Sequence, residues 1–328
     1  MRVFIINEHP DWLAPLGKLL DHAGIPWLEW YADAGQIDLD HSPPEGVYFN
    51  RMSASAQTRG HTYSVAHTRE LIAWLSSHGR RVINDARAFE LEMSKVRQHA
   101  ALKAAGICTP RGIAVVGGRD QILAAAGAFG FPLIIKPNRG GKGLGVRLAD
   151  SAEQLDAYLR SVNFEPSPDG VYLIQEYIRA TEPVITRCEF VGGEFIYALS
   201  SSTADGFELC PADGCAPCSV GGKFRLLDGF DDPIIPHLSA FARSAGLDVC
   251  GIEFVRDGLG RPYVYDINGT TNYNSAIEHN AARSAGAALV ALLSGALVEA
   301  RSQTSAPPTQ GLVEKTQGAG LGHGRVSC

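Results

Sequence analysis

Three oxygen-bearing side chains lie near the ends of two neighbouring apolar segments in the C-terminal third of the chain. Glu253 belongs to the segment Val249–Val255, and Asp266 and Asn268 close the segment Tyr263–Asn268. The polar, glycine-containing turn between the segments is typical of a β-hairpin. Alternation puts Asp266 and Asn268 on one face of the second strand, and Glu253 can lie opposite. Two carboxylates and an amide oxygen suit Mg²⁺, which leaves its other positions to phosphate oxygens and water. The pattern predicts a metal–phosphate site; the alternative is an ordinary hairpin with solvated acids.

A glycine-rich loop between two predicted strands forms the second candidate site. Lys136 closes the apolar strand Leu133–Lys136, and the loop that follows carries Arg139, Gly140, Gly141, Lys142, Gly143 and Gly145. Glycines let backbone N–H groups approach an anion closely, while the basic side chains supply charge. The loop is not a Walker A motif, because Val146 stands where that motif requires lysine. We predict that the loop covers a bound phosphate and that Lys136 contacts the same phosphate. The alternative is a flexible hairpin tip with a lysine whose charged end reaches the solvent.

Residues 1–88 alternate strand-like and helix-like segments. The predicted strands are Val3–Ile6, Val47–Phe49 and Val82–Ile83, and the predicted helices are Leu13–His22 and Ala66–His78. This alternation predicts a small α/β lobe with a parallel sheet. The first predicted strand is not followed by the G-x-G-x-x-G turn, so the fingerprint of dinucleotide-binding folds is absent here.

Several polar residues follow the predicted strand Val47–Phe49 and precede a helix. They are Asn50, Arg51, Ser53 and Ser55. Ligands of open α/β sheets favour the crevice at the carboxyl ends of the strands. We therefore expect these residues to contact a second substrate.

Residues 89–300 begin with a predicted amphipathic helix, Phe89–Ala105, that ends at Gly106. The segments predicted after it are a β-α-β unit and two further strand regions: Gly112–Val116, Arg119–Phe129, Leu133–Lys136, Tyr172–Gln175, and Arg187–Ala198 with a turn at Gly192-Gly193. From Arg301 onward, Gln, Ser, Thr, Pro and Gly dominate the sequence. Such a composition predicts a disordered tail over residues 301–328, because it cannot bury enough apolar surface to order itself.

Composition bounds the possible functions. The 328 residues, 45% of them hydrophobic, are enough for a sizeable core. The net charge of −6, from 29 basic and 35 acidic residues, argues against nonspecific nucleic-acid binding. The longest apolar segment, Ala287–Val298, is interrupted and too short to span a bilayer, and the N-terminal apolar run is too short for a signal peptide. We therefore expect a cytoplasmic protein that binds no membrane and keeps its seven cysteines reduced.

The order of the motifs carries a resemblance to a known family. The motifs are Ser94–Arg97 with Lys95, Ala105–Pro110, Pro132–Pro137 with the glycine-rich loop, Leu173–Ile178, Arg187–Gly193 and Asp266–Asn268. In this order they resemble the ATP-grasp superfamily, in particular the branch that includes the glutamate-adding ribosomal-protein ligases (RimK type). The likeness covers residues from about 90 to about 280. It implies an α/β (α+β) ATP-grasp fold over residues 89–300, with a lid subdomain at about 108–175, preceded by a preATP-grasp lobe over residues 1–88.

The resemblance also implies roles for individual residues. Lys95 and Lys136 would contact ATP phosphates from opposite sides, and the loop from Arg139 to Gly145 would close over them. The hinge strand Gln175, Glu176, Tyr177 and Ile178 would read the adenine edge. Glu253, Asp266 and Asn268 would hold one or two Mg²⁺, or Mn²⁺. From the residues alone, Lys95 also fits a surface lysine on a helix.

Three further positions concern the ribose, the phosphates and the substrate, and the first of them departs from the family pattern. Relatives usually carry an acid two residues before Arg187, where it can hold the ribose, and this chain has Ile185; Glu182 is the candidate substitute. Arg187 is expected to face the phosphates, although it also fits an exposed strand residue paired with an acid. Arg225 follows a flexible glycine pair, and its planar fork suits a substrate carboxylate or the transferring phosphoryl group.

Three cysteines, Cys210, Cys215 and Cys218, form a C-x₄-C-x₂-C cluster. A structural zinc would need a fourth ligand, which only Cys188 or Cys250 could supply through the fold. A reactive thiol pair and plain loop cysteines are the other interpretations.

The leading functional hypothesis is an ATP-dependent carboxylate–amine ligase that works through an acyl-phosphate. Its partners would be ATP, a small carboxylate and an amine such as an amino acid or peptide, and a homo-oligomer is possible. A phosphotransferase on the same scaffold, or a nucleotide-binding module without turnover, are the alternatives. The sequence shows no convincing Ser-His-Asp or Cys-His arrangement that would favour a hydrolase.

Overall fold

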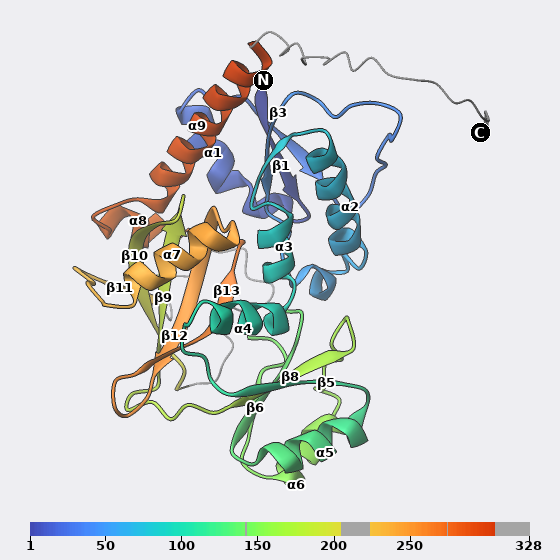
Figure 1. The fold of residues 1–328 in the computed structure, drawn as a ribbon, viewed down its shortest axis with the longest axis vertical. Coiled ribbons are helices and arrows are strands. Elements are labelled where there is room, and N and C mark those ends of the chain that lie inside the picture. The colour runs from blue at the N-terminus through green and yellow to red at the C-terminus, as the bar shows by residue number, and fades with distance from the viewer. Residues whose placement is uncertain (142, 205–223, 274, 306–328) are drawn as a thin grey trace, which may run out of the picture.

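Three β-sheets follow one another along the long axis of the molecule (Figure 1). The computed structural model describes residues 1–141, 143–204, 224–273 and 275–305. The N-terminal lobe lies at one end and the sheet that carries the glycine-rich loop at the other. A five-stranded sheet lies between them.

The N-terminal lobe is a parallel four-stranded sheet with the order β2-β1-β3-β4. Its elements are β1 (Arg2–Asn7), η1 (Pro10–Trp12), α1 (Ala14–His22), β2 (Trp27–Tyr31), β3 (Gly46–Asn50), η2 (Ala56–Arg59), α2 (Ser64–Ser77) and β4 (Arg81–Ile83). The parallel sheet predicted from the alternation is confirmed. Strand β2 was not predicted; this edge strand is only partly buried, and Glu29 interrupts its apolar side chains.

The second sheet has the order β5-β8-β6-β7, and α5 and α6 cover one face of it (Figure 1). Its elements are β5 (Gly112–Val116), α5 (Arg119–Phe129), β6 (Leu133–Pro137), β7 (Arg147–Ala149), α6 (Ala152–Leu159) and β8 (Val171–Glu176). The predicted strand–helix–strand segments are confirmed. The glycine-rich loop joins β6 to β7, so it lies at one end of this sheet.

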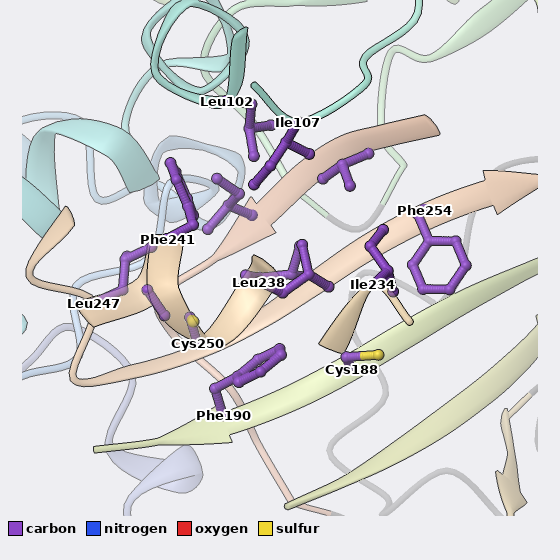
Figure 2. Close-up of a cluster of buried hydrophobic side chains, with 14 of the residues drawn as sticks. Leu102, Ile107, Cys188, Phe190, Ile234, Leu238, Phe241, Leu247, Cys250 and Phe254 are labelled. Carbon is purple, nitrogen blue, oxygen red and sulfur yellow. The ribbon is translucent and has the colours of Figure 1, made fainter. Parts of the chain in front are cut away.

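The central sheet has the order β11-β10-β9-β12-β13. Its strands are β9 (Val184–Val191), β10 (Glu194–Ser202), β11 (Phe224–Leu227), β12 (Val249–Arg256) and β13 (Pro262–Asn268), with α7 (Ile235–Ala245) against one face. Figure 2 shows the core on that face, where Cys188, Phe190, Cys250 and Phe254 of the sheet pack against Leu238 and its neighbours. The opposite face of the strands is therefore free to line a site.

The helix predicted over Phe89–Ala105 is two helices, α3 (Ala86–Glu92) and α4 (Lys95–Ala104). The break lies at Ser94, whose hydroxyl accepts a hydrogen bond from Arg97 N (3.2 Å) and so caps α4. The single-helix prediction was wrong because the apolar periodicity continues across a residue that is a preferred N-cap.

The C-terminal elements are α8 (Ser275–Asn280) and α9 (Ala285–Ser305). Residues 301–305 are helical, so the predicted disordered tail does not begin at Arg301; residues 306–328 lie outside the described part of the chain. By length and composition, Ala285–Gln303 could cross a membrane, so the apolar segment is longer than the sequence suggested. In this fold Leu289, Leu293 and Leu297 are buried against the N-terminal sheet, which accounts for the apolar face of α9.

Candidate active site

One cavity of about 1080 Å³ lies where the three sheets meet. Most of the site residues predicted from the sequence line it: Lys95, Lys136, Gly140, Gly141, Gly143, Gln175, Glu176, Tyr177, Ile178, Arg187, Glu253, Asp266 and Asn268. Residues of the N-terminal lobe line the same space, among them Arg51, Ser53 and Ser55. The fold thus gathers side chains from segments more than two hundred residues apart.

The acidic end of the cavity is built on the hairpin β12–β13. Glu253 pairs with Asp266 in the antiparallel register, and the register shifts between Glu253 and Phe254. The side chains of Val264 and Ile267 are buried in the core. Because of the register shift, the two residues between them, Tyr265 and Asp266, both line the cavity. The hairpin itself is confirmed, whereas simple alternation did not predict the place of Tyr265.

Lys95 and Asp266 form an ion pair across the cavity, with 2.5 Å between Nζ and Oδ1. Burial lowers the pKa of Lys95, but its attraction to Asp266 outweighs this effect and the net pKa is raised. Asn138 fixes the start of α4, because its Oδ1 accepts hydrogen bonds from Ser94 Oγ (3.1 Å) and Val96 N (2.9 Å). Lys95 is therefore a buried, oriented cation and not a surface lysine.

Lys136 points into the cavity from β6. Its Nζ donates a hydrogen bond to the Tyr265 carbonyl oxygen (3.2 Å) and lies 5.5 Å from the centre of the Tyr265 ring. Burial, with a smaller contribution from the charge of Lys95, lowers the pKa of Lys136 to about 7. Lys136 is only 3% exposed, so its ammonium group does not reach the solvent. A bound anion would raise its pKa and favour the charged form.

Arg187 connects β9 to the acidic end. Its Nε donates to Glu189 Oε1 (2.6 Å), its Nη1 to Glu253 Oε1 (2.9 Å) and its Nη2 to Thr271 Oγ1 (3.0 Å). The guanidinium lies across Gly251, where a Cβ would come within 2.1 Å of Nη2. Glycine at 251 is thus required by the close approach of Arg187. The pKa of Arg187 is raised, because the attraction of the two carboxylates outweighs the effect of burial.

The donor set at the hairpin fits a magnesium ion. Asn268 Nδ2 lies 3.4 Å from Glu253 Oε1 and 3.5 Å from Asp266 Oδ2, and a half-turn of the amide would present Oδ1 to the same space. Tyr265 OH donates to Glu253 Oε2 (3.1 Å) and orients this carboxylate. In the part of the chain that the structure describes, no three His, Cys, Asp or Glu side chains form a metal cluster, as expected when the third ligand is an amide.

Glu92 is a cavity residue that the sequence did not reveal. Its carboxylate accepts a hydrogen bond from Gly269 N, directly after β13. Burial raises the pKa of Glu92 to about 7, with an added contribution from the charge of Asp266. No local pattern marks this residue, because it is one acid at the end of an amphipathic helix.

Three predicted site residues in the described part of the chain do not line the cavity. Phe224 lines it, and strand alternation turns the next residue, Arg225, outward, where it is exposed. Glu182 is exposed in the turn before β9. Arg139 is half buried beside the lining, with a pKa lowered by burial. Lys142 lies outside the described residues.

The predicted hinge residues line the cavity, whereas the position expected to bind the ribose carries an apolar side chain. Gln175, Glu176, Tyr177 and Ile178 all line the cavity. The Glu176 carboxylate accepts a hydrogen bond from Arg111 N (3.1 Å), so it is held at the end of β8, beside the start of β5. Ile185 lines the cavity and is 5% exposed, which places an apolar side chain at the position where an acid was expected.

Of the cysteines considered as metal ligands, Cys188 and Cys250 are buried in the core that Figure 2 shows. Burial raises the pKa of both thiols well above the ordinary value, so neither is prepared to bind a metal as a thiolate. Cys210, Cys215 and Cys218 lie outside the described residues.

The three-sheet arrangement around one cavity, with two lysines, a glycine-rich loop and an acidic hairpin, defines a protein of the ATP-grasp class. Residues 93–289 match the sequence profile of the RimK-like ATP-grasp domain. The chain belongs to this family.

Curated relatives are named as ligases. The chain is 27% identical over 179 residues to a probable alpha-L-glutamate ligase of Mannheimia succiniciproducens, covering 54% of this chain and 56% of the relative. It is 28% identical over 188 residues to the probable alpha-L-glutamate ligase 2 of Pseudoalteromonas atlantica, covering 57% and 58%. The chain thus matches a little more than half the length of these relatives.

Solved structures share the fold over most of the chain. They include D-cycloserine synthetase DcsG (TM-score 0.63, 20% identity, covering 91% of this chain and 99% of that one). A RimK domain ATP-grasp protein from Sphaerobacter thermophilus gives a TM-score of 0.65 at 17% identity, covering 91% and 100%. The D-alanine–D-alanine ligase of Bacillus anthracis with ATP gives 0.61 at 17%, covering 93% and 98%. These similarities establish the fold.

Proposed function

We propose that the protein is an ATP-dependent carboxylate–amine ligase that forms an amide or peptide bond through an acyl-phosphate. The observation that carries the proposal is that two lysines, Lys95 and Lys136, converge in one cavity with two carboxylates and an amide: Glu253, Asp266 and Asn268. The names of the relatives and of the structural neighbours support ligation as the reaction type. The expected partners are ATP, a small acid and an amine, and the expected location is the cytoplasm.

ATP would lie between the hinge and the glycine-rich loop. Backbone groups of Tyr177 and Ile178 would contact the adenine, and Gly140, Gly141 and Gly143 would let N–H groups approach the phosphates. Lys136 would meet the phosphates from β6, and Lys95 from α4 on the other side. Because Ile185 is apolar, the ribose would have to be bound without an acid at position 185. That Glu182 takes over this role stays a prediction.

Glu253, Asp266 and Asn268 would hold one or two Mg²⁺, or Mn²⁺, and the metal would neutralise charge on the transferring phosphoryl group. Arg187 forms an ion pair with Glu253 and orients it, and Lys95 forms an ion pair with Asp266. A Mg–ADP complex of the ATP-grasp ligase PsnB supports a divalent metal in this fold.

The reaction needs two displacements. A carboxylate oxygen of the acid forms a bond to the γ-phosphorus while the bond from that phosphorus to the ADP oxygen breaks, and ADP leaves. The amine nitrogen then attacks the acyl carbon, the C–O bond to phosphate breaks, and the amine loses a proton. Glu92, which has a pKa of about 7 and lines the cavity, is an acceptor within the site for that proton. Positioning and charge neutralisation carry the rest of the rate.

Binding of nucleotide is expected to recharge Lys136. With a pKa of about 7, its amine is mostly neutral at pH 8.5, and nearby phosphates raise that pKa, so binding takes up close to one proton. Calorimetric titration with AMPPNP and Mg²⁺ in two buffers of different ionisation enthalpy measures this uptake. Lys136→Met is expected to abolish it, while Lys103→Met, an exposed lysine on α4, retains it. Equal uptake by both variants would contradict the role of Lys136.

Hydroxylamine distinguishes the ligase from the alternative functions. Supplied with Mg-ATP and a panel of carboxylates, the protein is expected to release ADP and phosphate and to yield a hydroxamate when hydroxylamine replaces the amine. A stable phosphorylated product without hydroxamate would establish the phosphotransferase instead. No ADP from any acid–amine pair, with AMPPNP still bound, would indicate a silent nucleotide-binding module.

A further inference from the structure

Arg51 is a buried cation in the wall that the N-terminal lobe contributes to the cavity. It directly follows β3, its side chain is only 5% exposed, and it lines the same cavity as Asn268 and Thr271. Its Nη2 donates a hydrogen bond to Asn272 Oδ1, and its guanidinium lies 5.8 Å from the centre of the Phe49 ring. The neutral amide of Asn272 orients the guanidinium but does not balance its charge.

Arg51 differs in its counterions from two partly buried arginines, Arg59 and Arg187. Arg59 pairs with Glu8 at 2.5 Å, and Arg187 pairs with both Glu189 and Glu253. Among the described residues, Arg51 forms no ion pair, and its Nε has no hydrogen-bond partner. Burial lowers its pKa, which reflects the cost of keeping this charge away from water.

A buried guanidinium that forms no ion pair is unfavourable, and the attraction between Arg51 and Glu8 does not outweigh the effect of burial. An incoming anion would supply the missing partner. The planar fork of arginine favours carboxylates, which it can bind through two parallel hydrogen bonds. Asn272 lies four residues after Asn268, so their Cα atoms are separated by no more than about 14 Å. One small substrate can therefore reach from the metal-site strand to Arg51.

We infer that Arg51 binds a non-reacting carboxylate of a substrate, so that one of the two ligated molecules carries a carboxylate besides its reacting group. This inference rests on the proposed ligase function and adds to it a residue that determines substrate specificity. The carboxylate has two chemical sources: an α-amino acid or peptide that reacts through its amine, or a dicarboxylic acid that reacts through its other end. Arg51 would select for such substrates against their uncharged counterparts, because a site built for a charge leaves it unpaired when the partner is missing.

The test compares matched ligands on wild-type protein and on Arg51→Met, with AMPPNP and Mg²⁺ present. One arm pairs L- and D-amino acids with their α-carboxamides, and the other pairs dicarboxylates with their monoamides. Thermal-shift measurements select the pairs, and calorimetry gives their dissociation constants. In one arm the wild-type protein is expected to bind the charged member about 10- to 100-fold more tightly. In Arg51→Met this ratio is expected to fall to about 1, while AMPPNP affinity is unchanged.

Two further variants keep the inference testable if Arg51→Met is unstable. Arg51→Lys is expected to restore part of the ratio, because it keeps the charge and loses the fork. Asn272→Ala removes an exposed side chain and is expected to lower the ratio severalfold without a change in melting temperature. A ratio that stays the same in all variants, no binding preference in wild type, or a loss of AMPPNP affinity equal to the loss of ligand affinity would overturn the inference. Binding that depends on Arg51 without any ADP release would refute the ligase and leave the carboxylate site standing.

Discussion

Asp266→Asn is expected to lower the rate of ADP formation by at least about a thousandfold, because the substitution removes a carboxylate from the proposed metal site, where charge would develop. The variant also leaves Lys95 without its carboxylate at 2.5 Å, so the buried ammonium loses the group that keeps it charged and oriented. A coupled assay for ADP release at saturating Mg-ATP gives kcat directly. AMPPNP affinity measured with and without Mg²⁺ reports the metal contribution.

Asp257→Asn is the matched control for this prediction. Asp257 lies in the turn of the same hairpin and pairs with Arg261 on the surface, outside the cavity lining. An exposed pair of this kind contributes little to stability, so this variant should keep the wild-type rate. Comparable losses in both variants, or full activity in Asp266→Asn, would refute the role of Asp266 in the chemistry.

Arg187→Met is expected to cost about 3–5 kcal/mol of unfolding free energy, the range for removing one partner of a buried ion pair. Glu189 and Glu253 are 2% and 4% exposed, and both lose their cation when Arg187 is replaced. Equilibrium urea unfolding at pH 7.5 measures the difference. The pKa of Glu253 is raised by burial even with Arg187 present, and without the arginine it rises further above its unfolded value. As the pH falls, Glu253 is protonated in the variant and no longer buries an unpaired charge. The loss of unfolding free energy is therefore expected to be smaller at pH 5 than at pH 7.5.

Arg225→Met is the control for Arg187→Met, since the sequence had placed both arginines in the site. Arg225 is exposed on the edge strand β11, so its replacement should change the unfolding free energy by no more than about 0.5 kcal/mol. A deficit for Arg187→Met that matches that of Arg225→Met, or that does not depend on pH, would show that the buried network is not what the arginine stabilises.

The sequence by itself determined the parts of the fold that depend on local pattern. The alternation in residues 1–88 predicted the parallel lobe, and the apolar segments around Glu253 and Asp266 predicted the hairpin. These predictions succeed because periodicities of two and of 3.6 residues arise from backbone geometry within a single element. The order of the motifs was also enough to indicate the family to which the chain belongs.

Only the tertiary structure decided which of these side chains meet. Lys95 and Asp266 are 171 residues apart, and their contact depends on Asn138 holding the start of α4 against β6. The irregular pairing opposite Phe254 turns Tyr265 into the cavity, which strict alternation did not allow. The reverse holds for Arg225, which alternation on β11 turns outward although its residue type suited a clamp.

Charge states, too, depend on the assembled cavity. Glu92 and Lys136 have pKa values near 7 because several segments together exclude water from them. Arg51 forms no ion pair among the described residues, whereas Glu8 pairs with Arg59. Such properties arise from burial and from neighbours that are distant in the chain, so no local pattern encodes them. The sequence therefore determined the elements and the family, while long-range packing decided the geometry and the electrostatics of the site.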